Sequence, residues 1–280
     1  MKIKIMSDST CDLPKELLET YDISIIPLTV VKDNEAFSDG VTITTDEIFA
    51  HVAAGGSLCS TAAVNVADYQ EKFAECSEKY DAVIHINISS EISSSYQNAT
   101  LAASEFDNVI TIDSRNLCTG QGLVVLKACE LSKTASSVEE IKEKLIEFTT
   151  KVEASFLIDR LDYMVKGGRC SMVAALGANL LGLKPCIEVK DGKLVVVKKY
   201  RGNYAKSLAS YVKERLDDRD DLDKKYLFVS HTPISDDCKK AVEDALAAYA
   251  DFENIYWAPA GSTISCHCGP GTLGVLFAKK

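Results

Sequence analysis

Five serines crowd a predicted turn between a strand and a helix. The segment 82–99, AVIHINISSEISSSYQNA, begins as a short apolar run typical of a buried strand, after which Ile92, Tyr96 and Ala99 recur at helical spacing. Such turns lie outside the carboxyl ends of parallel strands, where open α/β sheets bind ligands, and a helix start offers free N–H groups to an anion. The hydroxyls either contact an anionic ligand or cap the helix. They belong to Ser89, Ser90, Ser93, Ser94 and Ser95.

Two basic side chains stand beside glycines. His267 precedes Gly269-Pro270-Gly271, and a glycine-rich backbone lets an imidazole approach a ligand and donate to a carboxylate. A buried histidine that is hydrogen-bonded within the core is the alternative. Arg169 follows Gly167-Gly168, so its guanidinium could meet a carboxylate or a phosphate at the rim of a site. An ordinary surface arginine is the alternative there.

Motifs for other kinds of chemistry are absent from the sequence. It has no CxxC pair, and we expect Cys266-His267-Cys268 to be extended, so that its side chains alternate between faces and cannot converge on a metal. There is no G-x-S-x-G elbow, no Walker loop and no G-x-G-x-x-G. Cys11 and Cys59 lie near predicted loops, but no motif sets a histidine beside either. We therefore predict no metal site and no catalytic residue.

The composition excludes several classes of protein. The chain has 280 residues, of which 46% are hydrophobic and 26% charged, and this is typical of a globular protein large enough for two domains. Its net charge of −10 argues against a surface for nucleic acid or anionic membrane. No stretch approaches the roughly 18 apolar residues of a membrane span, and the N-terminus lacks the apolar core of a signal peptide. We expect a cytoplasmic protein whose ten cysteines stay reduced.

The elements that must position these residues alternate between strands and helices. Predicted strands at 2–6, 82–88 and 109–112 each run into a Ser or Asp, with helices between them, which indicates an α/β layer structure. Asp191-Gly192 predicts a hairpin in the second half of the chain.

Further local signals predict single elements. Asp33-Asn34 indicates a turn, Thr44 and Glu47 indicate the capping box of a helix, and residues 57–65 are expected to form a loop. The residues from about 204 to 216 predict a helix. We expect the segment 263–277 to contain a loop or strand that bears His267, then a Gly-Pro-Gly turn and a closing apolar strand.

Four motifs, in order along nearly the whole chain, resemble those of the DegV family of bacterial fatty-acid-binding proteins. The family's patterns SDSTCDLP, ISSxLSGTYQSA, LxYLxKGGR and HxGPGxxG are similar to residues 7–14, 88–99, 161–169 and 267–274. The resemblance implies an N-terminal three-layer α/β/α domain with a mostly parallel sheet, residues 1–155. It also implies a C-terminal α/β domain with a mixed sheet, residues 156–280, and a ligand tunnel between the two.

The resemblance also assigns roles to single residues. The family's threonine that contacts a carboxylate falls on Thr61, and the serine of its LSG turn falls on Ser93. His267 would complete the network around the head group, and Arg169 would lie at the entrance. Ala62-Ala63-Val64-Asn65 replaces the family's SQPS, and Ser94 replaces its glycine. These departures are expected to change the shape of the loop and the acyl preference. They leave the two hydroxyl residues, Thr61 and Ser93, in place.

The resemblance implies that this protein is a binding protein and not an enzyme. Such a binding protein would need no cofactor. It would enclose a long-chain fatty acid and present the carboxylate to a separate ATP-dependent fatty acid kinase, which makes the acyl phosphate for phospholipid synthesis. The apolar segment Met172–Leu183 is our candidate for the tunnel wall, with an ordinary core helix as the alternative. The fold family also includes the substrate domain of dihydroxyacetone kinase, so the alternative function is binding or phosphotransfer of a small carbonyl compound.

Overall fold

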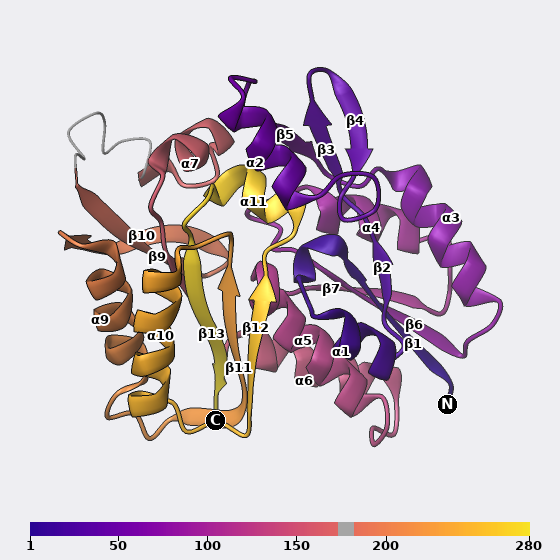
Figure 1. Cartoon of the computed structure of the whole chain (residues 1–280). Helices are drawn as coiled ribbons and strands as arrows, with labels where there is room; N and C mark the ends of the chain where they lie inside the picture. Colours follow the sequence, from indigo (N-terminus) through magenta and orange to yellow (C-terminus); the bar gives the residue numbers. More distant parts are fainter. Residues whose placement is uncertain (173–181) are drawn as a thin grey trace.

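Two separate sheets with helices against them make up most of the protein (Figure 1). The computed structural model describes residues 1–172 and 182–280. The predicted tunnel-wall segment Met172–Leu183 lies, apart from its ends, outside the described residues. The α/β class with one parallel and one mixed sheet is confirmed.

The first sheet has four parallel strands in the order β2-β1-β6-β7. Its central strand β6 is buried along its whole length, because helices cover both faces. Tyr69 and Phe73 of α3 pack on one face with α4, and α1, α5 and α6 pack on the other, which makes three layers. The strands are β1 (Ile3–Asp8), β2 (Ser24–Ile26), β6 (Ala82–Asn87) and β7 (Val109–Asp113). The helices are α1 (Lys15–Thr20), α3 (Val66–Ser77), α4 (Ser95–Ala103), α5 (Cys118–Leu131) and α6 (Val138–Thr149), and a 3₁₀ turn, η1, spans Ser9–Cys11.

A small antiparallel sheet, in the order β4-β3-β5, stands beside the first sheet together with α2. The predicted turn at Asp33-Asn34 joins β3 to β4, and the predicted capping box of Thr44 and Glu47 starts α2. The stretch 57–65, expected to be a loop, contains the short strand β5. The bounds are β3 (Thr29–Lys32), β4 (Glu35–Ser38), α2 (Thr45–Ala53) and β5 (Ser60–Ala62).

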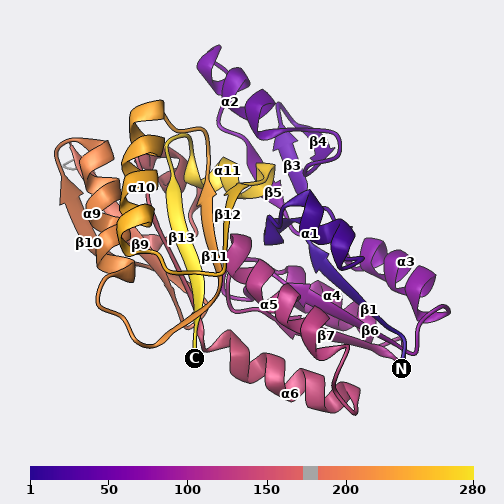
Figure 2. The same ribbon diagram turned by 60° about the horizontal axis from the view of Figure 1, so that its bottom comes forward.

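The second sheet has six strands in the order β10-β9-β8-β13-β11-β12 (Figure 2). Only the pair β11 and β12 is parallel, and the hairpin between β9 and β10 turns at the predicted Asp191-Gly192. The boundary predicted between residues 155 and 156 falls inside β8. The strands are β8 (Val152–Leu157), β9 (Leu183–Lys190), β10 (Lys193–Arg201), β11 (Leu222–His231), β12 (Asn254–Pro259) and β13 (Leu273–Lys279). The helices are α7 (Leu161–Gly167), α9 (Tyr204–Leu216), α10 (Asp236–Tyr249) and α11 (Ser262–Cys268).

The two sheets share one hydrophobic core. Helices α9 and α10 cover the outer face of the six-stranded sheet, while its inner face packs against α5 (Figure 2). Because α5 also packs against β1 and β6, the core runs from Ile86 of β6 through Leu126 of α5 to Leu276 of β13 without interruption. This continuous core fixes the carboxyl end of the first sheet against the second.

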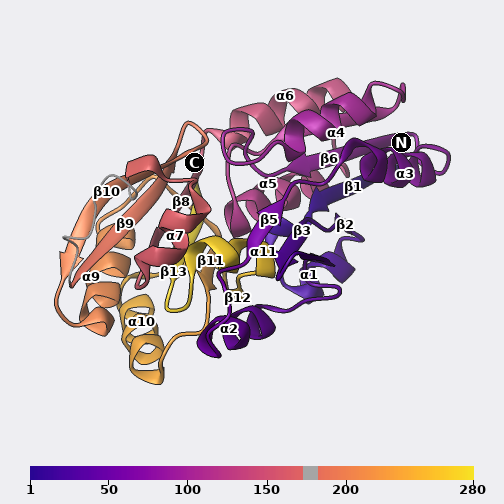
Figure 3. The same ribbon diagram turned by 90° about the horizontal axis from the view of Figure 1, so that it is seen from above.

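Residues 262–268, which bear His267, form a helix, so our expectation of a loop or strand there is wrong, whereas the expected closing strand is present as β13. The reason lies far away in sequence. The N–H groups of Gly261 and Ser262, at the start of α11, donate to Asp12 Oδ1 at 3.0 Å and Asp39 Oδ1 at 2.9 Å. These carboxylates satisfy the free amides of a helix start, a condition that no local signal in the sequence announces. Seen from above, β5, α7 and α11 meet over the junction of the two sheets (Figure 3).

Candidate functional site

All four predicted site residues line one cavity at the junction of the two sheets. The cavity, called here the outer cavity, has a volume of about 510 Å³, which includes space open to solvent. Thr61 comes from β5, Ser93 from the turn after β6, Arg169 from the segment after α7, and His267 from α11. The rest of the wall is mostly apolar and includes Leu28, Ile88, Ile92, Met164 and Leu194. A polar group of ligand size would therefore meet hydroxyls and two basic side chains here, with apolar surface around them.

Thr61 and His267 are joined directly. The hydroxyl of Thr61 lies 2.8 Å from Nε2 of His267. Pairing of β5 with β3 sets Thr61 opposite Val30, which is fully buried, and so fixes the strand that carries the hydroxyl. In the tautomer that carries its proton on Nε2, the imidazole donates to Thr61 and leaves the threonine proton free to donate to a ligand oxygen.

His267 is neutral at physiological pH in this environment. Burial, and next the positive charge of Arg169, lower its pKa to about 4. Its second nitrogen, Nδ1, has no hydrogen-bond partner among the described residues. Gly167 packs against that nitrogen so closely that a Cβ at residue 167 would lie 2.3 Å from Nδ1. The first glycine of the Gly167-Gly168 pair is therefore required by the position of the imidazole.

Ser93 is the one serine of the predicted cluster that lines the outer cavity. Its oxygen accepts from the backbone N–H of Ser95 at 3.2 Å and lies 2.9 Å from the Ser95 hydroxyl. Ser89 is fully buried and donates to the carbonyl of Gly192, and Ser90 donates to a carboxylate at the end of β7. Most of the cluster thus stabilises the turn and its contact with the second sheet.

Arg169 lies at the rim. Its side chain is exposed, and Nη1 donates to the carbonyl of Gly167 at 2.7 Å. No carboxylate is paired with this guanidinium among the ion pairs of the described residues. It is therefore available to an anion that enters the outer cavity or approaches it from solvent.

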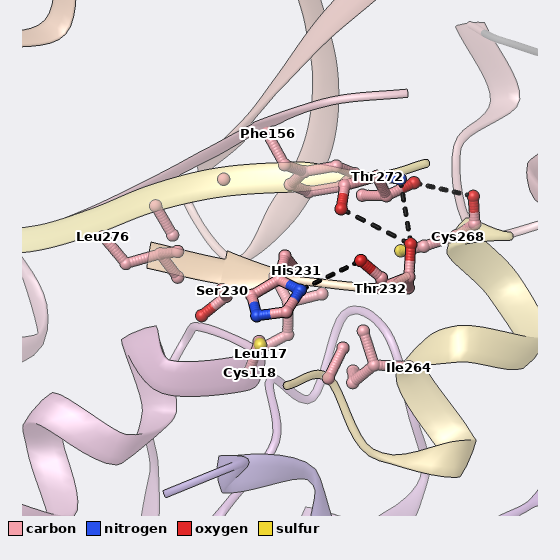
Figure 4. Close-up of a pocket in the computed structure, with 13 residues that line it drawn as sticks. Leu117, Cys118, Phe156, Ser230, His231, Thr232, Ile264, Cys268, Thr272 and Leu276 are labelled. Atoms are coloured by element: carbon pink, nitrogen blue, oxygen red, sulfur yellow. Dashed lines mark hydrogen bonds between the residues drawn. The ribbon is translucent and has the colours of Figure 1, made fainter. Parts of the chain in front are cut away.

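A second cavity, called here the inner cavity, adjoins the first, and its lining residues were not predicted from the sequence. It has a volume of about 390 Å³, which includes space open to solvent, and lies between α5, β8, β11, β13 and α11 (Figure 4). Leu117, Ile264 and Cys268 line both cavities. The remaining apolar wall is formed by Ala154, Phe156, Ala260, Gly274 and Leu276. Because five elements and the segments between them contribute one or two residues each, no single stretch of sequence signals it.

Most polar groups around the inner cavity are hydrogen-bonded within the protein. Thr232 accepts from the N–H of Thr272 at 2.9 Å (Figure 4). It also donates to the carbonyl of Gly269 at 2.9 Å, and the hydroxyls of Ser230 and Thr119 lie 2.5 Å apart. His231 also lines the cavity; its Nδ1 is bonded to the carbonyl of Thr232, and its Nε2 has no hydrogen-bond partner among the described residues. Apart from this imidazole, the inner cavity offers mainly apolar contact.

Residues of the SDSTCDLP motif make hydrogen bonds to α11 and to the serine turn, which lie on two sides of the outer cavity. Ser9 donates to Asp39 Oδ2 at 2.7 Å, and Asp39 and Asp12 receive the first N–H groups of α11, which carries His267. Asp8 accepts from the backbone N–H of Ile88 at 3.0 Å, directly before the serine turn. Sequence reasoning identified this motif but gave it no role, because its partners lie far along the chain.

The residues weighed for other chemistry form no second reactive site. Burial raises the pKa of the Cys11 thiol to about 12 and also raises the pKa of Cys59. Both thiols are therefore poor nucleophiles at neutral pH. In residues 1–172 and 182–280, no group of three His, Cys, Asp or Glu side chains could hold a metal ion. No helix in these residues is long and apolar enough to cross a bilayer.

The fold and the site define an α/β protein with two main sheets, in which a mostly apolar cavity that carries four polar or basic side chains adjoins a second apolar cavity. Residues 2–280 match the family model described as "Uncharacterised protein, DegV family". The chain belongs to the DegV family.

Individual proteins of the DegV family are similar to this chain in sequence and in structure. The chain is 33% identical over 288 residues to "Protein DegV" of Bacillus subtilis, with both chains covered completely. It is 30% identical to a "Fatty acid-binding protein" of Thermotoga maritima, over 98% of this chain and 96% of the relative. The solved structure described as "Fatty Acid Binding of a DegV family Protein from Thermus thermophilus" superposes with a TM-score of 0.89 at 27% identity, with all of both chains covered. Fatty-acid binding is thus a property of relatives within the DegV family.

Proposed function

We propose that this protein binds one long-chain fatty acid, with the carboxylate in the outer cavity and the acyl tail in the inner cavity. The single observation that carries the proposal is that the two cavities adjoin, with Leu117, Ile264 and Cys268 in the walls of both. A ligand that spans both must be polar at one end and apolar along the rest. The naming of DegV relatives as fatty-acid-binding proteins supports the same class of ligand.

The tail would supply most of the affinity. Burial of about fifteen methylenes contributes on the order of 12 kcal/mol at about 0.8 kcal/mol each, against association costs of about 4–15 kcal/mol. Thr61, Ser93 and His267 would then fix the head group, because a buried carboxylate without hydrogen bonds is costly. In this scheme Arg169 supplies the counter-charge at the rim.

The protein would act as a binding partner of an enzyme. A carboxylate held next to an exposed guanidinium stands close to solvent, where a separate ATP-dependent fatty acid kinase can reach it and form the acyl phosphate. We propose this partnership on the exposure of Arg169 and on the motifs shared with the family. The protein would need no cofactor of its own and would work in the cytoplasm, where acyl phosphates enter phospholipid synthesis.

The test is native mass spectrometry of protein purified without detergent, followed by organic extraction and identification of the released acid. We expect one acyl chain per protein, and an added saturated or unsaturated 16-carbon acid should exchange into it. Dihydroxyacetone is the matched probe for the alternative function as a carbonyl-binding protein. Protein that carries no acid, binds none of those added and yet binds dihydroxyacetone would replace our proposal with that alternative.

A further inference from the structure

One hydroxyl in the wall of the outer cavity has no hydrogen-bond partner. Thr263, in the first turn of α11, lines this cavity and is 4% exposed, and its Oγ1 is bonded to nothing among the described residues. The other two hydroxyls of the helix are used within the protein. Ser262 donates to the carbonyl of Ile43 at 3.1 Å, and Ser265 donates to that of Ala260 at 3.2 Å. A buried hydroxyl without a partner is uncommon, because burial removes the bonds that it makes in water.

Thr263 differs in this respect from the other two hydroxyl residues of the outer cavity. Thr61 is bonded to His267, and Ser93 is bonded to Ser95. A carboxylate held by Thr61 and Ser93 can take one hydrogen bond on each oxygen, which leaves Thr263 for another group. A threonine in a helix populates two χ1 rotamers. Because the hydroxyl of Thr263 makes no bond in its present rotamer, it can turn toward a ligand without breaking one.

Thr263 lies one helical turn from His267. Residues four positions apart share a face of a helix, and one turn is about 5.4 Å long. The two ends of α11 have different surroundings. The end with His267 packs against Gly167, close to the rim, whereas the N–H of Ser262 at the other end donates to the buried Asp39. Thr263 therefore lies toward the buried end of the helix.

The proposed path of the acyl tail runs beside Thr263. Ile264 and Cys268 of α11 line both cavities (Figure 4), while Thr263 and His267, next to them on the helix, line only the outer one. A tail that leads from a head group at His267 toward the inner cavity would run along α11, with its first carbons within reach of Thr263. A methylene at that point leaves the hydroxyl unpaired, whereas an oxygen on the chain would pair with it.

We propose that Thr263 binds a hydroxyl group carried by the acyl chain close to its carboxyl end, so that the site takes 3-hydroxy fatty acids. The inference rests on the proposed function and deepens it, because it names a class among the long-chain acids. A hydroxyl is both donor and acceptor, so the two groups can pair whichever of them supplies the proton. A site that hydrogen-bonds a hydroxyl of its ligand discriminates against the analogue that lacks it.

Binding of palmitic acid and 3-hydroxypalmitic acid to Thr263→Val tests this role. Valine keeps the shape of threonine and replaces the hydroxyl with a methyl group. We expect the affinity for 3-hydroxypalmitic acid to fall about tenfold, because the ligand hydroxyl would be buried without a partner. The affinity for palmitic acid should rise severalfold, because in the wild-type protein a methylene must displace any water that pairs with Thr263. A general disturbance of the site would not move the two affinities in opposite directions.

Two variants and one further ligand are the controls. Thr263→Ser keeps a hydroxyl and should keep the ratio of the two affinities. Thr45→Val removes a hydroxyl that donates to the carbonyl of Ala260 at 3.0 Å, just before α11, so it should lower the melting temperature and leave that ratio unchanged. The isomer ω-hydroxypalmitic acid has its hydroxyl at the far end of the chain and should lose no affinity in Thr263→Val.

The wild-type protein offers a test that needs no variant and serves if Thr263→Val does not fold. Because Thr263 lies on one side of the chain, the two enantiomers of 3-hydroxypalmitic acid should differ in affinity by at least about fivefold. Equal affinities would overturn the inference.

The outcomes separate this inference from the proposed function. If palmitic acid binds to the wild-type protein but Thr263→Val changes neither affinity, the inference is wrong and the fatty-acid site stands. Equal losses for both acids in Thr263→Val would place the hydroxyl at the carboxylate and would also overturn the inference alone. If the wild-type protein binds neither acid, the proposed function is wrong and the inference is overturned with it.

Discussion

Thr61 and His267 are 206 positions apart in the chain, yet their side chains are 2.8 Å apart and share a hydrogen bond. The bond links β5, in the small antiparallel sheet, to α11, which lies between β12 and β13 of the six-stranded sheet in the chain. It therefore spans the junction at which the outer cavity opens. A ligand bound by both residues would therefore also stabilise the junction between the sheets.

We predict that Thr61→Ala and Ser93→Ala each weaken palmitic acid binding by about 1–3 kcal/mol, the usual cost of losing a hydrogen bond to a charged group. The melting temperature of the ligand-free protein should change little, since both side chains line a cavity. Isothermal titration calorimetry measures the affinity. Ser60→Ala, on the same short strand but exposed, is the control. Unaltered affinity in both cavity variants would remove them from the head-group site.

Sequence reasoning succeeded where the signals are local. The capping box of Thr44 and Glu47, the Asp191-Gly192 hairpin and the helix predicted at 204–216 all depend on residues within a few positions of one another. The four site residues were found through motifs shared with a family, and the structure brings them to one cavity. What they bind stays a prediction.

Sequence reasoning failed where distant partners decide the structure. The helix α11 depends on carboxylates of Asp12 and Asp39 more than 220 positions earlier. The inner cavity has no local signal, because its wall is assembled from α5, α11, three strands of the six-stranded sheet and the segments between them. Five serines within seven residues looked equivalent in the sequence, yet only Ser93 lines the outer cavity. Ser90 turns toward β7 and Ser89 toward the second sheet, Ser95 is buried, and Ser94 is exposed.

Stability should depend on pH through His267. Its pKa is about 4 in the folded protein and 6.5 in an unfolded chain, so the unfolded chain binds a proton first as the pH falls. The folded state therefore loses stability between about pH 6.5 and pH 4. We predict that the wild-type protein loses on the order of 1–2 kcal/mol more than His267→Gln between pH 7.5 and pH 5, measured by urea unfolding without ligand. Parallel pH curves for the two proteins would contradict the lowered pKa.

Alanine substitutions at the two glycines before Arg169 should have different effects on affinity and stability. Alanine at Gly167 would place its Cβ 2.3 Å from His267 Nδ1, so the imidazole must move away from Thr61. Gly168 has nothing within 4 Å of its Cβ position but a φ of +68°, so alanine there costs about 1 kcal/mol of backbone strain. We predict that Gly167→Ala lowers palmitic acid affinity at least tenfold, while Gly168→Ala lowers the melting temperature and keeps the affinity. Equal affinities would show that His267 does not contact the head group.

The inner cavity should set the acyl length. Ala260→Leu adds three carbons to its wall and should displace about that many methylenes of the tail, each worth about 0.8 kcal/mol. We predict that affinity for a 16-carbon acid falls at least tenfold more than affinity for a 12-carbon acid. Competition against a fluorescent fatty acid measures both. Ala247→Leu, exposed on α10, is the control, and equal losses for both acids would place the tail elsewhere.

Arg169 separates binding of the acid from its use. The guanidinium is exposed at the rim, and among the described residues it bonds only to the carbonyl of Gly167. Removal of the guanidinium therefore leaves the buried tail site and the hydroxyls of Thr61 and Ser93 intact. After transfer of a phosphate to the carboxylate, the acyl phosphate would lie beside Arg169, whose guanidinium can stabilise the added charge through two parallel hydrogen bonds.

We predict that Arg169→Ala keeps most of its affinity for radiolabelled palmitic acid. Acyl phosphate formation with the fatty acid kinase of the source organism and ATP should fall at least tenfold, a loss of about 1.4 kcal/mol or more. Arg169→Lys should recover little of the rate, because an ammonium group cannot make the paired contact. Full phosphorylation of acid bound to Arg169→Ala would return this arginine to the role of a surface charge.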